Sequence, residues 1–269
     1  EKEQVEKLLS VENLEIKITQ KKHVITPVKD VSFNLLRGET IGIVGESGCG
    51  KTLTALSIMR LAKEEHLTYG GAIRFEGRNL LELKEKQLRG IRGSKISMIF
   101  QEPMTSLNPL FSIGNQLIET IRAHDKVSKG EAKSRAVELL KKVRIERAEQ
   151  VMKSYPYQLS GGMQQRVMIS MALACSPDLL IADEPTTALD VTIQFQILSL
   201  IKELQAKLGM ALLLISHDLG VVSQMVERVV ILYAGYVVET GNVDDIFLGP
   251  QHPYTRGLLK SVPNFAEKR

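Results

Sequence analysis

The segment GESGCGKT, residues 45–52, combines residue types that suit a triphosphate ligand. Its three glycines let the backbone curl so that successive N–H groups point inward, toward phosphate oxygens. An apolar run precedes the segment and a helical pattern follows it, so a helix N-terminus adds partial positive charge. Lys51 supplies a mobile positive charge for the β- and γ-phosphates, and the Thr52 hydroxyl can ligate Mg²⁺. The pattern G-x-x-x-x-G-K-[ST] therefore predicts an ATP-binding phosphate loop formed by Gly45, Glu46, Ser47, Gly48, Cys49, Gly50, Lys51 and Thr52.

A second group of reactive side chains ends the apolar run LLIADEP, residues 179–185. Asp183 is placed to hold Mg²⁺, because hard oxygen ligands suit that cation. Glu184 follows where a strand gives way to a loop, and we expect it to act as the general base that polarises a water for attack on the γ-phosphate. In isolation the pair also fits a solvated acidic turn, but the phosphate loop on the same chain favours the catalytic interpretation.

Cys49 lies inside the phosphate loop, close to Lys51 and to a helix N-terminus. Both features lower a thiol pKa, and a thiol of lowered pKa could be alkylated and protected by ATP. We favour the other interpretation, a small filler residue without a role. Cys175 is the other cysteine, and two cysteines form no disulfide framework, which fits a reducing compartment.

The elements that position these residues follow from the hydrophobic pattern. Continuous apolar runs alternate with helical spacing in the second half of the core, which predicts βαβ units and a parallel sheet. Residues 233–241 predict a closing hairpin, and residues 102–175 show helical spacing without a confident strand. Strands are expected at residues 14–18, 31–36, 40–45, 70–77, 95–103, 179–183, 211–216 and 229–233, and helices at 53–61, 113–124, 129–145, 161–175 and 192–208.

We therefore expect an ATP-binding α/β core formed by residues 1–101 and 176–240, an inserted helical subdomain at 102–175 and a C-terminal tail at 241–269. The length of 269 residues lies near the limit for one hydrophobic core. With 43% apolar and 25% charged residues the composition is that of a globular protein. No apolar run approaches the ~20 residues that cross a bilayer, and a net charge of +4 does not indicate nucleic acid or anionic lipid.

Further segments occur in a fixed order along the chain: FQEP with Gln101, LSGGMQQR (159–166), ADEPTTALD (182–190), SHD (216–218) and HPYTRGLLKSVP (252–263). Together with the phosphate loop they resemble the nucleotide-binding subunit of an ATP-binding-cassette (ABC) transporter, over about residues 10–263. The segments QEPMTSLNP, YPYQLSGGM and HPYTRGLL resemble most the subgroup that powers dipeptide, oligopeptide and nickel importers. The resemblance implies a P-loop NTPase core of the ABC type with an N-terminal antiparallel β-subdomain and an inserted α-helical subdomain.

The resemblance also implies residue roles. Gln101 would sense the γ-phosphate and Mg²⁺ and link the core to the helical subdomain. His217 would contact the γ-phosphate and hold the attacking water, although a lone His after a strand also fits a structural role. Asp190 would lie at a dimer seam. A serine and two glycines at a helix start would grip ATP bound to a second subunit, which agrees with their chemistry as an anion site: Ser160, Gly161 and Gly162.

Two features leave alternatives open. The aromatic residue that the family stacks on adenine is missing, and His23 is the available substitute, against a bland surface loop. The other is an apolar group after Gln101, which would either be buried as core or form the groove that receives a cytoplasmic helix of a membrane subunit. That group consists of Leu107, Leu110, Phe111 and Ile113.

From these observations we expect an ATPase subunit of an ABC importer, on the cytoplasmic side of the cell membrane, that powers uptake of peptides or of nickel or a metal chelate. Its expected ligands are ATP and Mg²⁺. Its expected partners are a second ABC ATPase subunit, two transmembrane permease subunits and, indirectly, an extracytoplasmic solute-binding protein. The alternative is a soluble ABC-type ATPase that acts on nucleic acid or the ribosome. Because Lys and Arg are interleaved with acidic residues, we expect no nucleic acid partner.

Overall fold

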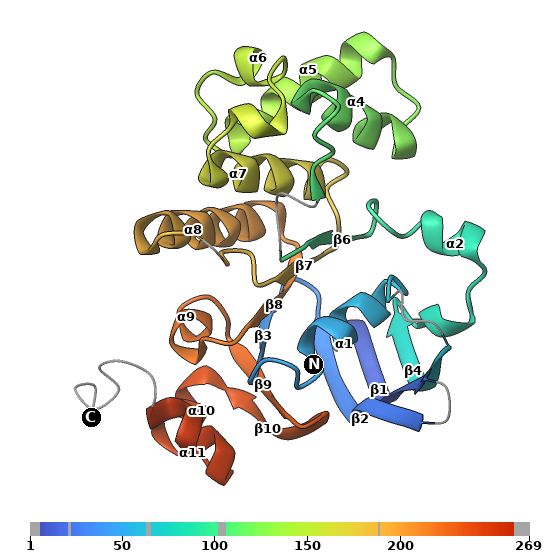
Figure 1. Cartoon of the computed structure of the whole chain (residues 1–269), viewed down its shortest axis with the longest axis vertical. Helices are drawn as coiled ribbons and strands as arrows, with labels where there is room; N and C mark the ends of the chain where they lie inside the picture. The colour runs from blue at the N-terminus through green and yellow to red at the C-terminus, as the bar shows by residue number, and fades with distance from the viewer. Residues whose placement is uncertain (1–5, 21–22, 63–65, 102–105, 188, 261–269) are drawn as a thin grey trace, which may run out of the picture. The chain divides into compact units, whose positions relative to one another are not determined.

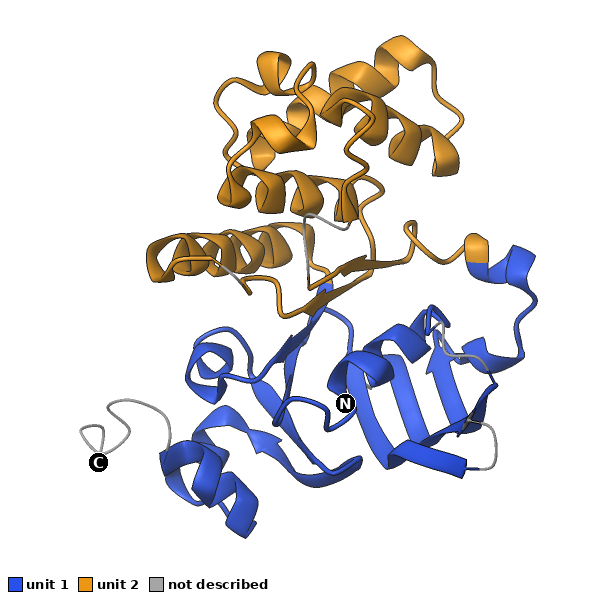
Figure 2. Ribbon diagram, in the orientation of Figure 1, with its two compact units in different colours: residues 1–88, 211–269 blue, residues 89–210 orange. Residues whose placement is uncertain are grey.

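The computed structural model describes residues 6–20, 23–62, 66–101, 106–187 and 189–260. Contacts within the chain divide it into two compact units, which Figure 2 distinguishes by colour. The first unit contains Glu1–Leu88 and Ala211–Arg269, and the second contains Arg89–Met210. The second unit is thus inserted, in sequence, between the two segments of the first.

The first unit is built on strands in the order β5-β4-β1-β2-β10-β9-β3-β8. Its N-terminal part is an antiparallel sheet, visible at the blue end of Figure 1, in which β1 pairs with both β2 and β4. This confirms the N-terminal antiparallel β-subdomain. The strands are β1 (Lys7–Gln20), β2 (His23–Leu36), β4 (Leu67–Phe75) and β5 (Arg78–Asn79), followed in space by β10 (Tyr236–Asn242), β9 (Arg228–Tyr233), β3 (Thr40–Val44) and β8 (Ala211–Ser216).

The strand β3 leads into the phosphate loop and lies between two parallel neighbours. Its register pairs Val44 with Ser216 on β8 and with Ile231 on β9. All five residues of β3 are buried, as are the first five of β8. Parallel strands covered on both faces are apolar throughout, which is why these runs lack alternation.

Helices of the first unit are short. The first of them, α1, begins at Lys51 directly after Gly50, and Ala55 and Ile58 anchor it in the core. The tail of the first unit forms two helices, of which α10 contacts β10 (Figure 1). The bounds are α1 (Lys51–Ile58), η1 (Leu80–Glu82), α9 (Leu219–Ser223), α10 (Val243–Leu248) and α11 (Pro253–Lys260), while α2 (Glu85–Arg89) crosses the boundary between the units.

The second unit combines two parallel strands with the expected helices. The strand β6 (Ile96–Ile99) pairs with β7 (Leu179–Asp183), and Ile99 lies opposite Ala182. Ser112, Ser128 and Ser160 each cap a helix by accepting a hydrogen bond from a backbone N–H three residues later, which explains where these helices begin. The helices are α4 (Ile113–His124), α5 (Lys129–Lys142), α6 (Ala148–Val151), η2 (Pro156–Gln158), α7 (Gly161–Ala172) and α8 (Val191–Leu208).

The expected strands and long helices are all present, because each expected segment overlaps an observed element of the same type. Residues 106–175 contain no strand, as expected for the helical segment. The contact division places β6, β7 and α8 with these helices, so it falls at different residues from the expected domain limits. The expected limit at residue 102 lies outside the described residues, and so does the end of the tail, residues 261–269; the limits stay a prediction of the sequence.

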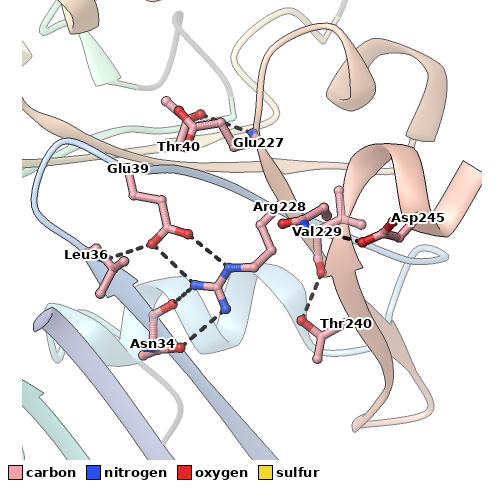
Figure 3. A network of polar contacts seen from close by, with 10 residues as sticks. Asn34, Leu36, Glu39, Thr40, Glu227, Arg228, Val229, Thr240 and Asp245 are labelled. Atoms are coloured by element: carbon pink, nitrogen blue, oxygen red, sulfur yellow. Dashed lines mark hydrogen bonds and ion pairs between the residues drawn. The ribbon is translucent and has the colours of Figure 1, made fainter. Parts of the chain in front are cut away.

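A polar network joins three strands of the first unit at the end of β3 that is remote from the phosphate loop (Figure 3). The Arg228 guanidinium donates to both carboxylate oxygens of Glu39, at 2.9 and 3.3 Å. It also donates to the Asn34 backbone carbonyl at 2.5 Å and to its side-chain oxygen at 3.3 Å. The same carboxylate accepts from the Leu36 N–H at 2.7 Å. A largely buried ion pair of this kind needs such additional hydrogen bonds to offset desolvation.

Candidate nucleotide-binding and catalytic site

The phosphate loop has a backbone that only glycine can follow at its first position. A Cβ atom at Gly45 would lie 2.2 Å from the Leu232 carbonyl oxygen and 2.7 Å from the Cys49 sulfur. Gly48 and Gly50 have φ angles of 81° and 102°, in the left-handed region. The loop is therefore a curled cradle directly before a helix N-terminus, and this backbone fits a phosphate group.

The Lys51 side chain folds back onto the phosphate loop. Its ammonium group donates to the backbone carbonyls of Gly45 at 2.8 Å and Glu46 at 2.9 Å. The side chain is buried, with 5% of its surface exposed. Thr52 in the first turn of α1 is exposed. The structure thus places Lys51 against two carbonyls of the loop, and the roles of Lys51 and Thr52 toward a nucleotide stay predictions.

The structure contradicts the expectation that the pKa of the Cys49 thiol is lowered. Its side chain is buried, and burial raises the pKa of the thiol more than the nearby Lys51 ammonium lowers it. Desolvation disfavours the thiolate, which is the charged form. The loop cysteine is therefore less reactive than its neighbours in sequence indicate, which favours the filler interpretation.

His217 lies at a position that corresponds to the start of the loop. Because Val44 and Ser216 are register partners, Gly45 and His217 each follow the carboxyl end of neighbouring parallel strands. The imidazole is exposed. Asp218 then caps α9 by accepting from the Val221 N–H at 3.0 Å, which fixes the turn that carries the histidine.

His23 is the first residue of β2 and is exposed, opposite Gln20 on β1. The phosphate loop approaches the same strand further along, where a Cβ on Gly50 would lie 2.9 Å from the Pro27 carbonyl oxygen. Four residues of extended strand separate His23 from Pro27, a distance of about 13 Å. Stacking of His23 on adenine thus remains a prediction.

In the second unit, Glu184 directly follows β7 and is held by two hydrogen bonds to the same carboxylate oxygen. Gln101 Nε2 donates to Glu184 Oε2 at 3.1 Å, and Thr187 Oγ1 donates to it at 3.0 Å. Glu184 has a φ angle of 43°, a left-handed conformation that costs a non-glycine residue about 1–3 kcal/mol. The preceding Asp183 is buried at the strand end, with 2% of its surface exposed. The parallel pairing of β6 with β7 explains why Gln101 and Glu184 meet.

The segment LSGGMQQR (159–166) and Asp190 also lie close together. Ser160 accepts from the Met163 N–H at 3.4 Å and caps α7, and Asp190 accepts from the Ile193 N–H at 3.0 Å and caps α8. A Cβ on Gly162 would lie 3.0 Å from the Ile193 side chain, so the two helix starts are neighbours. Ser160, Gly161 and Asp190 are exposed. Two helix N-termini with exposed polar caps thus face solvent side by side.

The apolar group after Gln101 divides into two pairs. Leu107 and Ile113 are buried as core, with 2% and 0% of their surface exposed. Leu110 and Phe111 are 79% and 51% exposed. The core interpretation is therefore right for one pair, and the docking interpretation stays open for the other.

Thr52 in the first unit and Asp183 in the second are the residues expected to hold Mg²⁺. Hydroxyl and carboxylate oxygens are the hard donors that Mg²⁺ prefers, so the residues fit the ion. In the described part of the chain, no three His, Cys, Asp or Glu residues gather as a metal cluster. Mg²⁺ commonly takes one or two protein ligands together with substrate phosphates, so the sparse donor set suits it.

Two residues of interest were missed from the sequence. Thr187 carries no signal of its own within TTALD, since its role depends on the turn that brings its hydroxyl to Glu184. Tyr254 lies in the HPYTRGLL segment, and its hydroxyl accepts a hydrogen bond from the Glu46 N–H of the phosphate loop at 2.9 Å.

Across the described ranges, no helix has the length and apolar character of a membrane span.

Comparisons with known proteins identify the family. The family model described as ABC transporter matches residues 28–187, and the model described as the oligopeptide/dipeptide transporter C-terminal region matches residues 238–269. The probable peptide ABC transporter ATP-binding protein y4tR of Sinorhizobium fredii is 54% identical over 96% of this chain and 77% of its own length. The oligopeptide transport ATP-binding protein AppD of Bacillus subtilis is 54% identical over 95% of this chain and 78% of its own.

The glutathione import ATP-binding protein GsiA of Escherichia coli K12 is 52% identical over 95% of this chain, which spans 42% of the length of GsiA. Among solved structures, the dimeric post-hydrolysis state of the ATP-binding cassette MJ0796 with ADP and Pi has a TM-score of 0.77 at 31% identity. That match covers 87% of this chain and 98% of the other. The structure of cbiO1 from Clostridium perfringens, part of the ABC transporter complex cbiONQ, has a TM-score of 0.75 at 26% identity over 97% and 98% of the two chains. The phosphate loop, the Gln101–Glu184 pair and these matches together show that the chain belongs to the ABC transporter family, as an ATP-binding and ATP-hydrolysing subunit.

Proposed function

We propose that this subunit hydrolyses ATP to power the import of peptides across the cytoplasmic membrane. The proposal depends mainly on the 54% identity to a probable peptide transporter protein across 96% of the chain. The match of residues 238–269 to the oligopeptide/dipeptide transporter C-terminal region supports it. Nickel or a metal chelate, the other expected cargo, has no counterpart in the names of the three relatives above.

The phosphate loop and Lys51 bind the triphosphate in this proposal, and His23 packs on adenine. Thr52 and Asp183 hold Mg²⁺, with Gln101 as a further oxygen ligand. When bound, the cation neutralises charge on the phosphate oxygens. Two observations support the loop assignment, namely the buried Lys51 ammonium on two loop carbonyls and the absence of room for a side chain at Gly45.

Glu184 acts as the general base. It takes a proton from water as the water oxygen bonds to the γ-phosphorus, while the bond between that phosphorus and the ADP oxygen breaks. Gln101 and Thr187 orient the carboxylate, and His217 contacts the γ-phosphate. The strained backbone of Glu184 supports this role, because such strain persists at functional sites.

A second cassette completes the site. Residues 160–162 and Asp190 meet the ATP and the seam of the partner, and the exposed Val191 and Phe195 on α8, next to Asp190, support an interface there. Leu110 and Phe111 receive a helix of one of two transmembrane permease subunits. An extracytoplasmic solute-binding protein delivers the cargo to those subunits, and the cassette lies on the cytoplasmic face, where ATP is available.

The test is uptake by proteoliposomes that contain the full transporter with ATP on the side of this subunit. We expect a labelled oligopeptide to enter and to stimulate ATP hydrolysis, while Glu184→Gln transporter takes up none. Uptake of Ni²⁺ without peptide uptake would contradict the peptide assignment. Steeply salt-dependent RNA binding by the purified subunit, with ATPase stimulated by RNA, would support the alternative class instead.

A further inference from the structure

The C-terminal helix α11 reaches back to the phosphate loop. The Glu46 N–H donates to the Tyr254 hydroxyl at 2.9 Å, although 208 residues separate the two in sequence. Glu46 is the second residue of the loop, and its own side chain is exposed. The contact joins the C-terminal segment of the first unit to the ATP-binding loop of the same unit.

Several contacts within the first unit place Tyr254 in this position. Its ring packs on Tyr233, with ring centroids 4.4 Å apart and planes inclined by 40°. The start of α11 is fixed by Glu239, which accepts from the N–H groups of Gln251 at 2.7 Å and His252 at 3.0 Å. Leu259 on the same helix is buried. The hydroxyl is therefore supplied by an anchored helix and a packed ring.

The contact continues through the loop to the lysine. The Glu46 carbonyl accepts from Lys51 Nζ at 2.9 Å and from the Cys49 N–H at 3.3 Å. The N–H of Glu46 is bound by Tyr254 and its carbonyl by Lys51, so both backbone polar groups of one residue are fixed. A shift of Glu46 would move the carbonyl on which the Lys51 ammonium rests.

We propose that Tyr254 is a positioning residue for the nucleotide, which fixes the Glu46 backbone and thereby the Lys51 ammonium, so that the C-terminal helix sets the affinity for ATP. The proposal rests on ATP binding at the loop and is independent of the transported solute. Burial raises the pKa of the Tyr254 phenol, so the hydroxyl stays neutral and keeps its role as acceptor near pH 7.

The first test is Tyr254→Phe, which keeps the ring on Tyr233 and removes only the oxygen. We expect the dissociation constant for ATP and the KM to rise about two- to ten-fold, the worth of one hydrogen bond, while kcat changes less. The matched control is Tyr233→Phe, because the Tyr233 hydroxyl makes no hydrogen bond within the described residues; its ATP affinity should stay within about two-fold. Unchanged affinity in Tyr254→Phe, or an equal loss in Tyr233→Phe, would overturn the proposal.

A second test separates the hydrogen bond from general packing. Glu46→Pro removes the donor, so Tyr254→Phe should cause no further loss of ATP affinity in that background. The same fold loss in both backgrounds would mean that Tyr254 acts through other contacts.

If Glu46→Pro does not fold, hydrogen exchange of the wild type and Tyr254→Phe supplies the answer. Exchange at the Glu46 amide should become faster in Tyr254→Phe, and equal exchange would refute the proposal. Failure of the wild type to bind ATP would overturn both this proposal and the nucleotide assignment, whereas equal binding by wild type and Tyr254→Phe would overturn this proposal alone.

Discussion

The role of Glu184 can be isolated by Glu184→Gln, because the amide has nearly the shape of the carboxylate and can keep the hydrogen bonds from Gln101 and Thr187. Gln101 and Thr187 both donate to the same carboxylate oxygen, Oε2. The amide oxygen of Gln can accept from both donors. We therefore expect a folded protein whose free energy of unfolding changes by less than about 0.5 kcal/mol.

Glu184→Gln nevertheless loses the base. A positioned general base contributes roughly 10²–10⁴-fold to a rate, which corresponds to about 2.7–5.4 kcal/mol of transition-state stabilisation. We expect kcat for ATP hydrolysis to fall by at least about 100-fold. The dissociation constant for ATP should stay within about two-fold, because the carboxylate acts on water and the phosphate loop holds the nucleotide.

Thr187→Val provides the comparison, since it removes one of the two orienting bonds and leaves the carboxylate. The loss of one hydrogen bond, about 1 kcal/mol, predicts a fall in kcat of about five-fold. Phosphate release measures kcat, and fluorescence titration with an ATP analogue measures affinity. Hydrolysis by Glu184→Gln at the wild-type rate would refute the base assignment, and a larger loss in Thr187→Val than in Glu184→Gln would refute the orienting argument.

Four further outcomes are expected. Phe111→Asp should abolish uptake by the assembled transporter and spare hydrolysis by the subunit alone, because the ring is half exposed; equal loss of both activities would argue for a core role. Arg228→Met should lower the free energy of unfolding in urea by about 3–5 kcal/mol, since it leaves the Glu39 carboxylate buried without its cation; a loss below about 1 kcal/mol would contradict the network. Gly45→Ala should abolish ATP binding, measured by calorimetry, because its Cβ would lie 2.2 Å from a carbonyl oxygen. Burial raises the pKa of Cys49, so its alkylation by iodoacetamide should keep accelerating with pH beyond about 8.5, and a plateau below that pH would contradict the shift.

The strands that carry the reactive groups could be predicted because their signals are local. The runs that became β3, β7 and β8 are apolar throughout and end at the loop, at Asp183 and before His217. Ser160, which was expected at a helix start, likewise caps α7. These strands are buried on both faces of the sheet, and the apolar composition of each run indicates that burial.

Contacts between distant segments could not be predicted in this way. The Glu46–Tyr254 bond joins residues whose approach depends on the path of β10 and α11, and no pattern in either segment encodes it. The Cys49 pKa was predicted in the wrong direction, because charge neighbours are visible in sequence and burial is not. For the same reason the sequence does not show that Leu107 is buried while Leu110 is exposed, because burial depends on which other segments cover each side chain.

The position of β3 has a consequence for synthesis of the chain. Its two neighbours, β8 and β9, come from residues 211–233, beyond the whole inserted unit. A ribosome that adds about 5–20 residues per second needs roughly 10–40 s to synthesise the chain from the end of β3 to the end of β9. Throughout that interval the apolar strand β3 lacks its two neighbouring strands. A stalled ribosome or an early stop would therefore release a fragment that aggregates or binds chaperones.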